Sequence, residues 1–460
     1  MAMASKGFAS DMLVLYCIAF LDLCGAGMVT TLLPVYLKDH VGFTASISGV
    51  VLSIYGAVQF LSSPVFGGFA DLHGYRRALT LGLFACVPAY SLLAWPFWLT
   101  IILARFLAGL FKHTQNLCKS AIGAALPRHL QLKAFGRINA MGNVGFIVAP
   151  FVAGHVAHTF GIEAVFILAS MVYAVNGCFC YFCRVLDFKV EQSLDSPVHS
   201  SSTLSTSIKK SYQCGGGPRN GETIRNHSKE ENHGTNGFAN GHVDAAFVPT
   251  AKSEAASTNE IVLLWRLAKT VEWSRHWDLF ASKLLFSFGV LLYRATMSWI
   301  LAERFLLDKR SLGYLTSFQG VISFVCSFAA GLFSGFNHVH LFAGFSALQL
   351  ISFVGLIASS SLVGYVGSIA SLCVATSFMR AISYDLSTER CYSSEVGLLM
   401  GLSASLISGA RAIAPLLGGL LHDYSIDLPG VGAILVTFVG LMITVLFTND
   451  KQKMPKLSVD

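Results

Sequence analysis

The chain has 460 residues, of which 54% are hydrophobic and only 12% are charged, and its formal net charge is +7. Soluble globular proteins contain about 25% charged residues, so this composition excludes an ordinary soluble protein and indicates a membrane protein. The positive charge does not indicate nucleic-acid binding, because the basic residues lie largely in a central linker, short loops and the tail, as the positive-inside rule expects.

Apolar runs of about 20 residues, each long enough to span the core of a bilayer, recur along the whole chain. They lie at about residues 12–37, 47–69, 78–94, 97–118, 138–156, 164–182, 279–301, 312–333, 341–358, 362–384, 396–421 and 432–447. The first run is too long for the core of a cleavable signal peptide. The pattern therefore predicts an all-α polytopic membrane protein with about 12 transmembrane helices, six on each side of a linker.

The composition changes between the sixth and seventh runs. The stretch 184–260 is rich in Ser, Gly, Asn, His and Lys and predicts a disordered cytosolic linker, because it has too few apolar residues to fold. The predicted domains are an N-terminal six-helix bundle (1–183), this linker (184–260), an amphipathic interfacial segment (261–278), a C-terminal six-helix bundle (279–448) and a cytosolic tail (449–460).

Basic residues in the short loops favour cytosolic termini. The loop before the fifth run carries Arg128, Lys133 and Arg137, whereas Lys38 follows the first run on the opposite side. The residues that count against this orientation, on a predicted outer loop, are Arg304, Lys309 and Arg310. We expect both termini and the linker in the cytosol, with the plasma membrane and an endomembrane both left open.

The two halves of the chain repeat. A shift of 265 residues places a run of small residues around a proline in the fifth span over a similar run in the eleventh. Small residues beside a helix proline permit close packing and a bend. The predicted packing residues are Gly145, Ala149, Pro150 and Gly154 in the fifth span and Ala414, Pro415, Gly418 and Gly419 in the eleventh. Gly, Ala and Pro are common in any membrane helix, but the matched spacing favours a true repeat.

A glycine-rich loop with paired arginines follows the second span. Its residues Gly67, Asp71, Gly74, Arg76 and Arg77 fit the pattern G-x3-D-x2-G-x-[RK]-[RK]. Gly67 would let two helices approach closely, Gly74 would supply a turn, and Asp71 could pair with an arginine. This loop resembles the one between the second and third helices of the major facilitator superfamily, and the resemblance implies a conformational gate. The loop at 331–340 has neither Asp nor Arg, so the charged gate is expected in the first half alone.

Three further motifs resemble the tetracycline-efflux-like, drug:proton antiporter branch of that superfamily. They are Leu21-Asp22-x2-Gly25-x-Gly27 ending in Pro34, Arg105-x3-Gly109, and Gly145-x3-Ala149-Pro150-x2-Ala153-Gly154. The stretch 104–114 also resembles an orphan animal solute carrier of the superfamily. The resemblance implies two six-helix bundles related by pseudo-symmetry, alternating access, a cavity lined by spans 1, 4, 7 and 10, and proton antiport in preference to uniport.

The first half carries several charges deep in apolar runs, where each costs on the order of 3 kcal/mol. Asp22 is expected in a cavity or in proton coupling, and the alternative is an ion pair that only fixes packing. Arg105, Lys112 and Lys119 are spaced by seven, which places them on one face of a continuous helix. Arg105 and Lys112 are predicted cavity residues, unless Arg105 pairs with Asp22 or caps carbonyls. Asn116 lies on the same stripe, and the neighbouring His113 is either a pH sensor or a packing histidine.

The second half adds Arg294, Gln319, Arg380 and Arg411 as candidate cavity residues, although a lone Gln319 also fits a helix interface. Cations thus outnumber the one deep acid, and arginine grips carboxylates and phosphates bidentately. We therefore predict a secondary transporter of a small organic anion. The alternatives are a neutral or cationic solute bound at Asp22, and a non-transporting scaffold or sensor that keeps the fold.

The chain contains no nucleotide-binding loop, zinc spacing or nucleophile motif, and its 11 cysteines lie mostly in apolar runs, where we expect them reduced. We therefore expect no enzyme activity, no cofactor and no metal. The expected partners are a small-molecule substrate, protons and the lipid bilayer, without nucleic acid, and the expected oligomeric state is a monomer.

Overall fold

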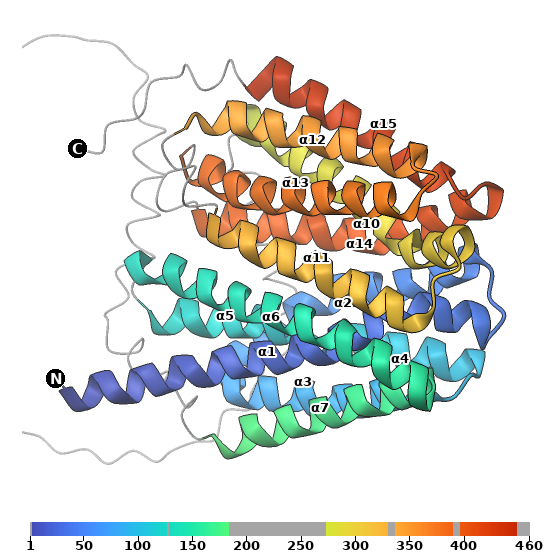
Figure 1. Ribbon diagram of the computed structural model, residues 1–460. Coiled ribbons are helices and arrows are strands. Elements are labelled where there is room, and N and C mark those ends of the chain that lie inside the picture. The colour runs from blue at the N-terminus through green and yellow to red at the C-terminus, as the bar shows by residue number, and fades with distance from the viewer. Residues whose placement is uncertain (1, 127, 184–272, 330–335, 390–395, 449–460) are drawn as a thin grey trace, which may run out of the picture. The chain divides into compact units, whose positions relative to one another are not determined.

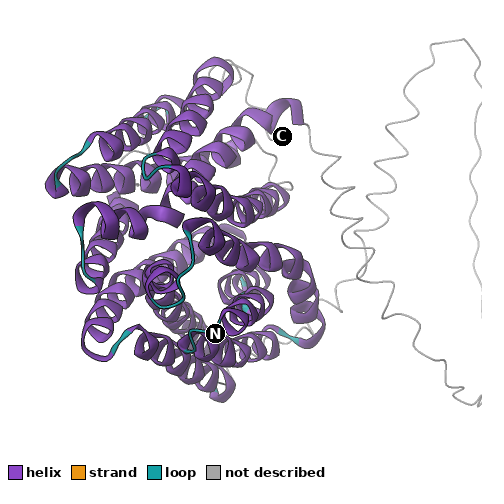
Figure 2. Ribbon diagram, turned by 90° about the vertical axis from the view of Figure 1, so that its right-hand side faces the viewer, coloured by secondary structure: helices purple, strands orange, loops and turns teal. Residues whose placement is uncertain are grey.

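The computed structural model describes residues 2–126, 128–183, 273–329, 336–389 and 396–448, which fold as helices joined by short loops (Figures 1 and 2). The helices of the first half are α1 (Ala2–Asp39), α2 (Ala45–His73), α3 (Tyr75–Ser91), the 3-10 turn η1 (Leu92–Ala94), α4 (Trp98–Phe111), α5 (Thr114–Ala125), α6 (Arg128–Phe160) and α7 (Ile162–Phe182). Those of the second half are α10 (Trp273–Phe305), α11 (Lys309–Ala329), α12 (His338–Ala358), α13 (Leu362–Glu389), α14 (Val396–Tyr424), α15 (Leu428–Ile443) and the π-helical end η5 (Thr444–Thr448).

These helices confirm the predicted fold class. Nine helices within the described ranges are long and apolar enough to cross a membrane. The fourth predicted span is divided between α4 and α5, and α10 begins at Trp273, inside the segment predicted to lie at the interface. The predicted linker (184–260), the part of the interfacial segment before Trp273 and the predicted tail (449–460) lie outside the described residues.

Each half has its own apolar core. In the first half the largest fully buried side chains include Tyr36, Phe166 and Tyr173, and in the second half Phe353 and Tyr365 occupy the corresponding interior. Many other large apolar side chains are exposed, which suits helices surrounded by lipid rather than by water. The two cores meet where Val35 of α1 joins the second-half cluster, and the described helices of both halves form one compact unit.

Glycines let the two halves meet backbone to backbone in two places related by the internal repeat. Helix α2 packs on α14, where a Cβ built on Gly56 would lie 2.7 Å from the carbonyl oxygen of Arg411. Helix α11 packs on α6, where a Cβ on Gly320 would lie 3.1 Å from the carbonyl oxygen of Phe146. No larger side chain fits at Gly56 without moving a helix, because the neighbouring atom belongs to a main chain.

The proline motifs of the repeat take part in the same two interfaces. Gly49 of α2 lies against the carbonyl of Pro415, and Gly313 of α11 lies against the carbonyl of Pro150, each too close for a side chain. The shift of about 265 residues that relates the halves also relates these two contacts. Other members of the motifs pack within a half, since Gly145 contacts α1, Ala149 faces Gly27 of α1, and Gly418 faces α10, while Ala414 is fully buried.

We call the end of the bundle at which α1 finishes the distal end. Here α1 and α10 cross through two pairs of residues that are themselves equivalent in the repeat, 265 residues apart. Lys38 forms an ion pair with Glu303, and the indole Nε1 of Trp299 donates a hydrogen bond of 2.8 Å to the carbonyl of Pro34. The crossing therefore lies on the axis that relates the halves.

On either side of this crossing, polar contacts join α2 to α14 and α6 to α11 at the distal end. The Asp423 carboxylate of α14 accepts the backbone N–H groups of Ala45 and Ser46, at 3.0 Å each, and so caps the start of α2 in the other half. On the opposite flank Arg310 donates to Nδ1 of His158 at 3.1 Å. Hydrogen bonds with main-chain and side-chain donors thus join both helix pairs at this end.

Charge reversal tests how much the Lys38–Glu303 pair contributes to distal closure. Lys38→Glu is expected to raise the labelling rate of a cysteine placed at buried Ser298 by about two- to fivefold, because side chains a third exposed contribute about 1 kcal/mol at most. Adding Glu303→Lys should bring the rate back toward that of the parent. Labelling with a thiol reagent, corrected for the parent that lacks Ser298→Cys, measures this, and a swap that labels as fast as the single variant would contradict it.

Candidate functional site

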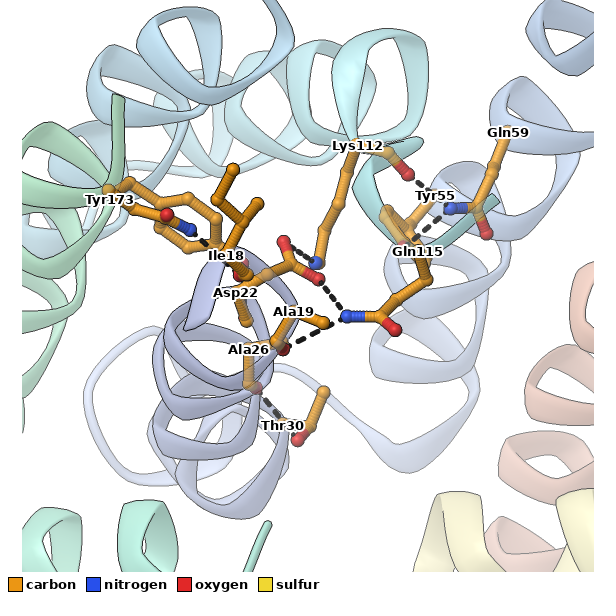
Figure 3. A network of polar contacts seen from close by, with 11 residues as sticks. Ile18, Ala19, Asp22, Ala26, Thr30, Tyr55, Gln59, Lys112, Gln115 and Tyr173 are labelled. Carbon is orange, nitrogen blue, oxygen red and sulfur yellow. Dashed lines mark hydrogen bonds and ion pairs between the residues drawn. The ribbon is translucent and has the colours of Figure 1, made fainter. Parts of the chain in front are cut away.

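Asp22 lies at the centre of a buried polar network in the first half (Figure 3). Its side chain is fully buried in α1, and its Oδ1 is 2.7 Å from the Nζ of Lys112. Its Oδ2 accepts a hydrogen bond of 3.1 Å from the side-chain amide of Gln115, which also donates to the carbonyl of Ala19. Both carboxylate oxygens are therefore occupied, by one cation and one neutral donor.

Helix α7 holds the backbone of α1 on the other side of this network. The Tyr173 hydroxyl donates to the main-chain carbonyl of Asp22 at 2.9 Å, and the Asn176 amide donates to the carbonyl of Ile18 at 3.1 Å. The Tyr173 ring lies against Gly25, where a Cβ would be 2.5 Å from the ring. Gly25 is thus needed so that Tyr173 can reach α1, which gives the glycine of the Asp22 motif a packing role.

The fourth span is interrupted at Lys112 and His113, where α4 ends and α5 begins. Helix α2 supplies polar partners at the interruption. The Gln59 side-chain amide donates to the Lys112 carbonyl at 2.7 Å, and the Ser62 hydroxyl lies 2.8 Å from Nε2 of His113. The Gln59 contact satisfies a main-chain carbonyl that an unbroken helix would pair internally, and at the break the Lys112 side chain reaches Asp22.

The break corrects the prediction of one continuous basic stripe. Arg105 and Lys119 belong to different helices, so their spacing from Lys112 does not place the three on one face. The alternative in which Arg105 pairs with Asp22 is also wrong, because Lys112 is the cation that contacts the carboxylate. Arg105 instead stacks on the ring of Tyr55, with 4.5 Å between the guanidinium carbon and the ring centroid.

His113 has the surroundings of a packing histidine. Its side chain is 2% exposed, its ring lies 5.1 Å from the ring of Phe66, and Ser62 also donates to the carbonyl of Gly109 beside it. The His113 side chain fills the space between α2 and the interrupted span. These surroundings fit a packing histidine, one of the two roles considered from the sequence, the other being a pH sensor.

The remaining candidates divide by exposure. Asn116, Arg294, Arg380 and Arg411 have exposed side chains, whereas Gln319 is buried and donates to the sulfur of Met297 at 3.7 Å. The exposed arginines lie within electrostatic range of buried or half-buried groups: Arg411 and Arg380 act on Lys119 of the other half, and Arg294 and Arg380 act on Cys373. The structure thus brings the cations of α5, α13 and α14 near one another, and Gln319 is not among them.

The loop after α2 adopts the turn expected of its glycine. Gly74 has φ of 90° and its N–H bonds to the carbonyl of Ala70 at 2.8 Å. Arg76 donates to the carbonyl of Tyr181 at the end of α7, and Arg77 is exposed. No described atom lies within 4 Å of a Cβ built on Gly67, so the expected close approach is not present there. The side chain of Asp71 lies outside the described residues.

Several residues of the network were not found from the sequence. They are the polar side chains of Tyr55, Gln59, Ser62, Gln115, Tyr173 and Asn176. Two of the pairs, Gln59 with Ser62 and Tyr173 with Asn176, are three residues apart within apolar spans, so each pair lies on one helix face. That spacing of uncharged polar residues is a signal that an inspection of charges alone passes over.

An arrangement of two six-helix halves, one of which holds a buried ion pair, is typical of a membrane transporter, and comparison with known proteins agrees. The chain belongs to the Major Facilitator Superfamily, whose family model matches residues 15–269. It is 23% identical to human solute carrier family 67 member A1 over 452 residues, which cover 97% of this chain and 93% of that protein. It is 29% identical to the class E tetracycline resistance protein of Escherichia coli over 195 residues, 42% of this chain and 45% of that protein.

Solved structures share the fold. The human organic anion transporter MFSD10 superposes with a TM-score of 0.59 at 18% identity, covering 94% of this chain and 98% of that one. A POT peptide transporter in complex with alafosfalin superposes with a TM-score of 0.64 at 14% identity, covering 96% and 95%. The protein is therefore an integral multi-pass membrane protein of a family of secondary transporters for small molecules.

Proposed function

We propose that this protein transports a small organic anion by alternating access, coupled to the antiport of protons. The observation that carries the proposal is that cations of both halves lie within electrostatic range of one another, Lys119 of α5 with Arg411 and Arg380, while Asp22 is already engaged by Lys112. An anion that binds between Lys119 and Arg411 would relieve their repulsion and draw the halves together.

The exposure of the arginines supports a water-filled cavity between the halves. Arg294 lies well inside the span of α10 and Arg411 near the middle of α14, yet both are exposed, and Arg380 is exposed near the end of the span in α13. A guanidinium in the middle of a span is too costly to leave in lipid, so its exposed surface must meet water or a ligand. Asn116 is exposed one turn before Lys119 on α5 and belongs to the same proposed cavity, whereas Gln319 supports its lining from behind.

The state of Asp22 favours an anion over a cationic solute. A carboxylate that free cations could reach would suit a cationic substrate, but both oxygens of Asp22 already accept hydrogen bonds inside the first half. We assign Asp22 and Lys112 to proton coupling, with Arg105 and His113 beside them. Protonation of Asp22 would break the ion pair and so change how α1 and the fourth span hold together.

The proposal also includes an orientation in the membrane and a gate on the cytosolic side. We place the distal end outside and the termini in the cytosol, so that the arrangement is closed to the outside. The loop of Gly67, Asp71, Gly74, Arg76 and Arg77 would gate the cytosolic side, where Arg76 already ties α3 to the end of α7. The similarity to the human organic anion transporter MFSD10 supports this substrate class by analogy, and we propose that the protein works as a monomer.

Flux in proteoliposomes tests the proposal. Panels of organic anions, cations and neutral solutes are compared with and without an imposed pH gradient. We expect anion flux that the gradient drives, and Arg411→Gln should raise the KM for the anion by about tenfold, since a lost charge-assisted hydrogen bond costs about 1.5–3 kcal/mol. Lys309→Gln on the distal loop is the matched loss of charge and should leave KM unchanged.

Other outcomes of the same experiment reject parts of the proposal. Flux that ignores the pH gradient in both the parent and Asp22→Asn would remove the proton from the mechanism. Flux of cations alone would reject the anion, and equal KM values for Arg411→Gln and the parent would remove the proposed cavity site. Absence of flux for every class, in protein shown to be folded, would favour a scaffold or sensor.

A further inference from the structure

The buried charges of the first half do not balance. Asp22, Lys112 and Arg105 are 0%, 8% and 5% exposed, so three charged side chains are buried within the same half. One carboxylate and two cations give this cluster a net charge of +1. Lys112 and Asp22 satisfy each other at 2.7 Å, and among the described residues Arg105 forms no ion pair.

Arg105 is poorly satisfied in the part of the chain that the structure describes. Its stabilising contact is the face of Tyr55, and its Nε is a buried donor without a hydrogen-bond acceptor. A cation–π contact contributes about 2 kcal/mol when desolvated, whereas burying an uncompensated ion costs several kcal/mol. A guanidinium held in this way is expected to acquire an acceptor that carries a negative charge.

A second donor accompanies the guanidinium. The Tyr55 hydroxyl oxygen accepts a hydrogen bond of 2.9 Å from the Gln59 amide, so its own hydrogen is available to donate. Gln59 also bonds to the Lys112 carbonyl at 2.7 Å, which fixes the position of Tyr55 relative to the break in the fourth span (Figure 3). Arg105 and Tyr55 therefore present N–H and O–H donors from two helices, and no carboxylate of the described residues pairs with Arg105.

We propose that Arg105, with Tyr55, binds a single small monovalent anion of halide size inside the first half. We propose a small occupant because Arg105 is only 5% exposed, so little open surface leads to its donors in this arrangement. The proposed site differs from the one between the halves, and the negative charge of its occupant offsets the excess positive charge of Asp22, Lys112 and Arg105. The same chemistry, one negative charge that accepts N–H bonds, could come from a free halide or from a carboxylate group at the end of a bound substrate.

Thermal unfolding of the full-length protein in chloride and in gluconate tests the site without any substrate. At constant ionic strength, chloride should raise the unfolding midpoint in a saturable way, because it binds the folded state and gluconate is too large to enter. Arg105→Gln should abolish the difference between the two salts, and it should fold, because it removes an unpaired buried charge. Arg137→Gln, the matched loss of an exposed arginine that has no role in the proposed cavity, should keep the difference.

The net charge of the cluster predicts changes of opposite sign. Asp22→Asn raises the net charge from +1 to +2 and should strengthen chloride binding by about tenfold, whereas Lys112→Gln lowers it to zero and should weaken binding by about tenfold. Each variant is compared with itself in the two salts, so a lower starting stability does not enter the affinity. Asp22→Asn combined with Lys112→Met restores a net charge of +1 and should restore the affinity of the parent.

Two results would overturn the site: a folded parent protein that is indifferent to chloride, or a chloride effect that persists in Arg105→Gln. Adding a transported organic anion then identifies the source of the charge. If the organic anion competes with chloride, a substrate carboxylate occupies the same site. If the two bind independently, the site holds a halide of its own. In either case the anion bound at Arg105 is the one that chloride represents in the test. Because the primary test contains no substrate, failure of the flux experiment leaves its result intact.

Discussion

Replacing Asp22 by asparagine is expected to lower the free energy of unfolding by about 3–5 kcal/mol. Asparagine keeps the shape of the side chain and removes the carboxylate that contacts the Lys112 ammonium at 2.7 Å. The Lys112 side chain is 9% exposed, so water cannot replace the lost counter-charge, and the cation stays buried without a partner. Denaturant unfolding of the purified protein, followed by tryptophan fluorescence, measures the change.

The reciprocal change and the double change separate the ion pair from its surroundings. Lys112→Met should cost a similar amount, because it leaves a buried carboxylate with only the Gln115 amide. The double variant Asp22→Asn with Lys112→Met should unfold within about 1–2 kcal/mol of the parent, since neither charge then remains unpaired. Losses that simply add in the double variant would show that Asp22 and Lys112 do not act as a pair.

The sequence identified the members of this pair but not the pairing. Asp22 and Lys112 were recognisable because charges within apolar spans are rare and need a reason. The spacing argument then treated the fourth span as one helix, and no glycine or proline stands at Lys112 or His113 to signal the break. Gln59 and Ser62 of α2 hold the break through side-chain contacts, and such contacts between distant segments have no periodicity within the span itself.

The fold was more accessible than the site for a physical reason. The length of an apolar run and the placement of basic loops are fixed by the bilayer, which acts on every span separately. The repeat could be predicted from Pro150 and Pro415, which lie 265 residues apart. Which helices these prolines contact could not be predicted from the sequence. Gly49 and Gly313 face those prolines from the other half, and their roles depend on which helices meet.

Replacing Gly419 by leucine is expected to reduce transport by about tenfold or more. A Cβ on Gly419 would lie 3.0 Å from the Cα of Ser46, with the Ala45 carbonyl nearer still, so a side chain there must separate α14 from α2 at the distal end. Overpacking costs about 1–3 kcal/mol, and this cost falls only on the arrangement in which the distal end is closed. Flux in proteoliposomes and labelling of Ser298→Cys should respond together, with slower flux and faster labelling.

Gly344 provides the matched control, because on α12 no described atom lies within 4 Å of a Cβ built there, and Gly344→Leu should change neither flux nor labelling. Equal behaviour of Gly344→Leu and Gly419→Leu would reject the packing argument.

Gly154 occupies the equivalent place on the other flank, against the main chain of Arg310. If the two flanks close as one unit, Gly154→Leu and Gly419→Leu should slow transport to a similar extent. A large difference between them would mean that the distal end opens about one helix pair while the other stays packed, so the repeat would be symmetric in structure but not in motion.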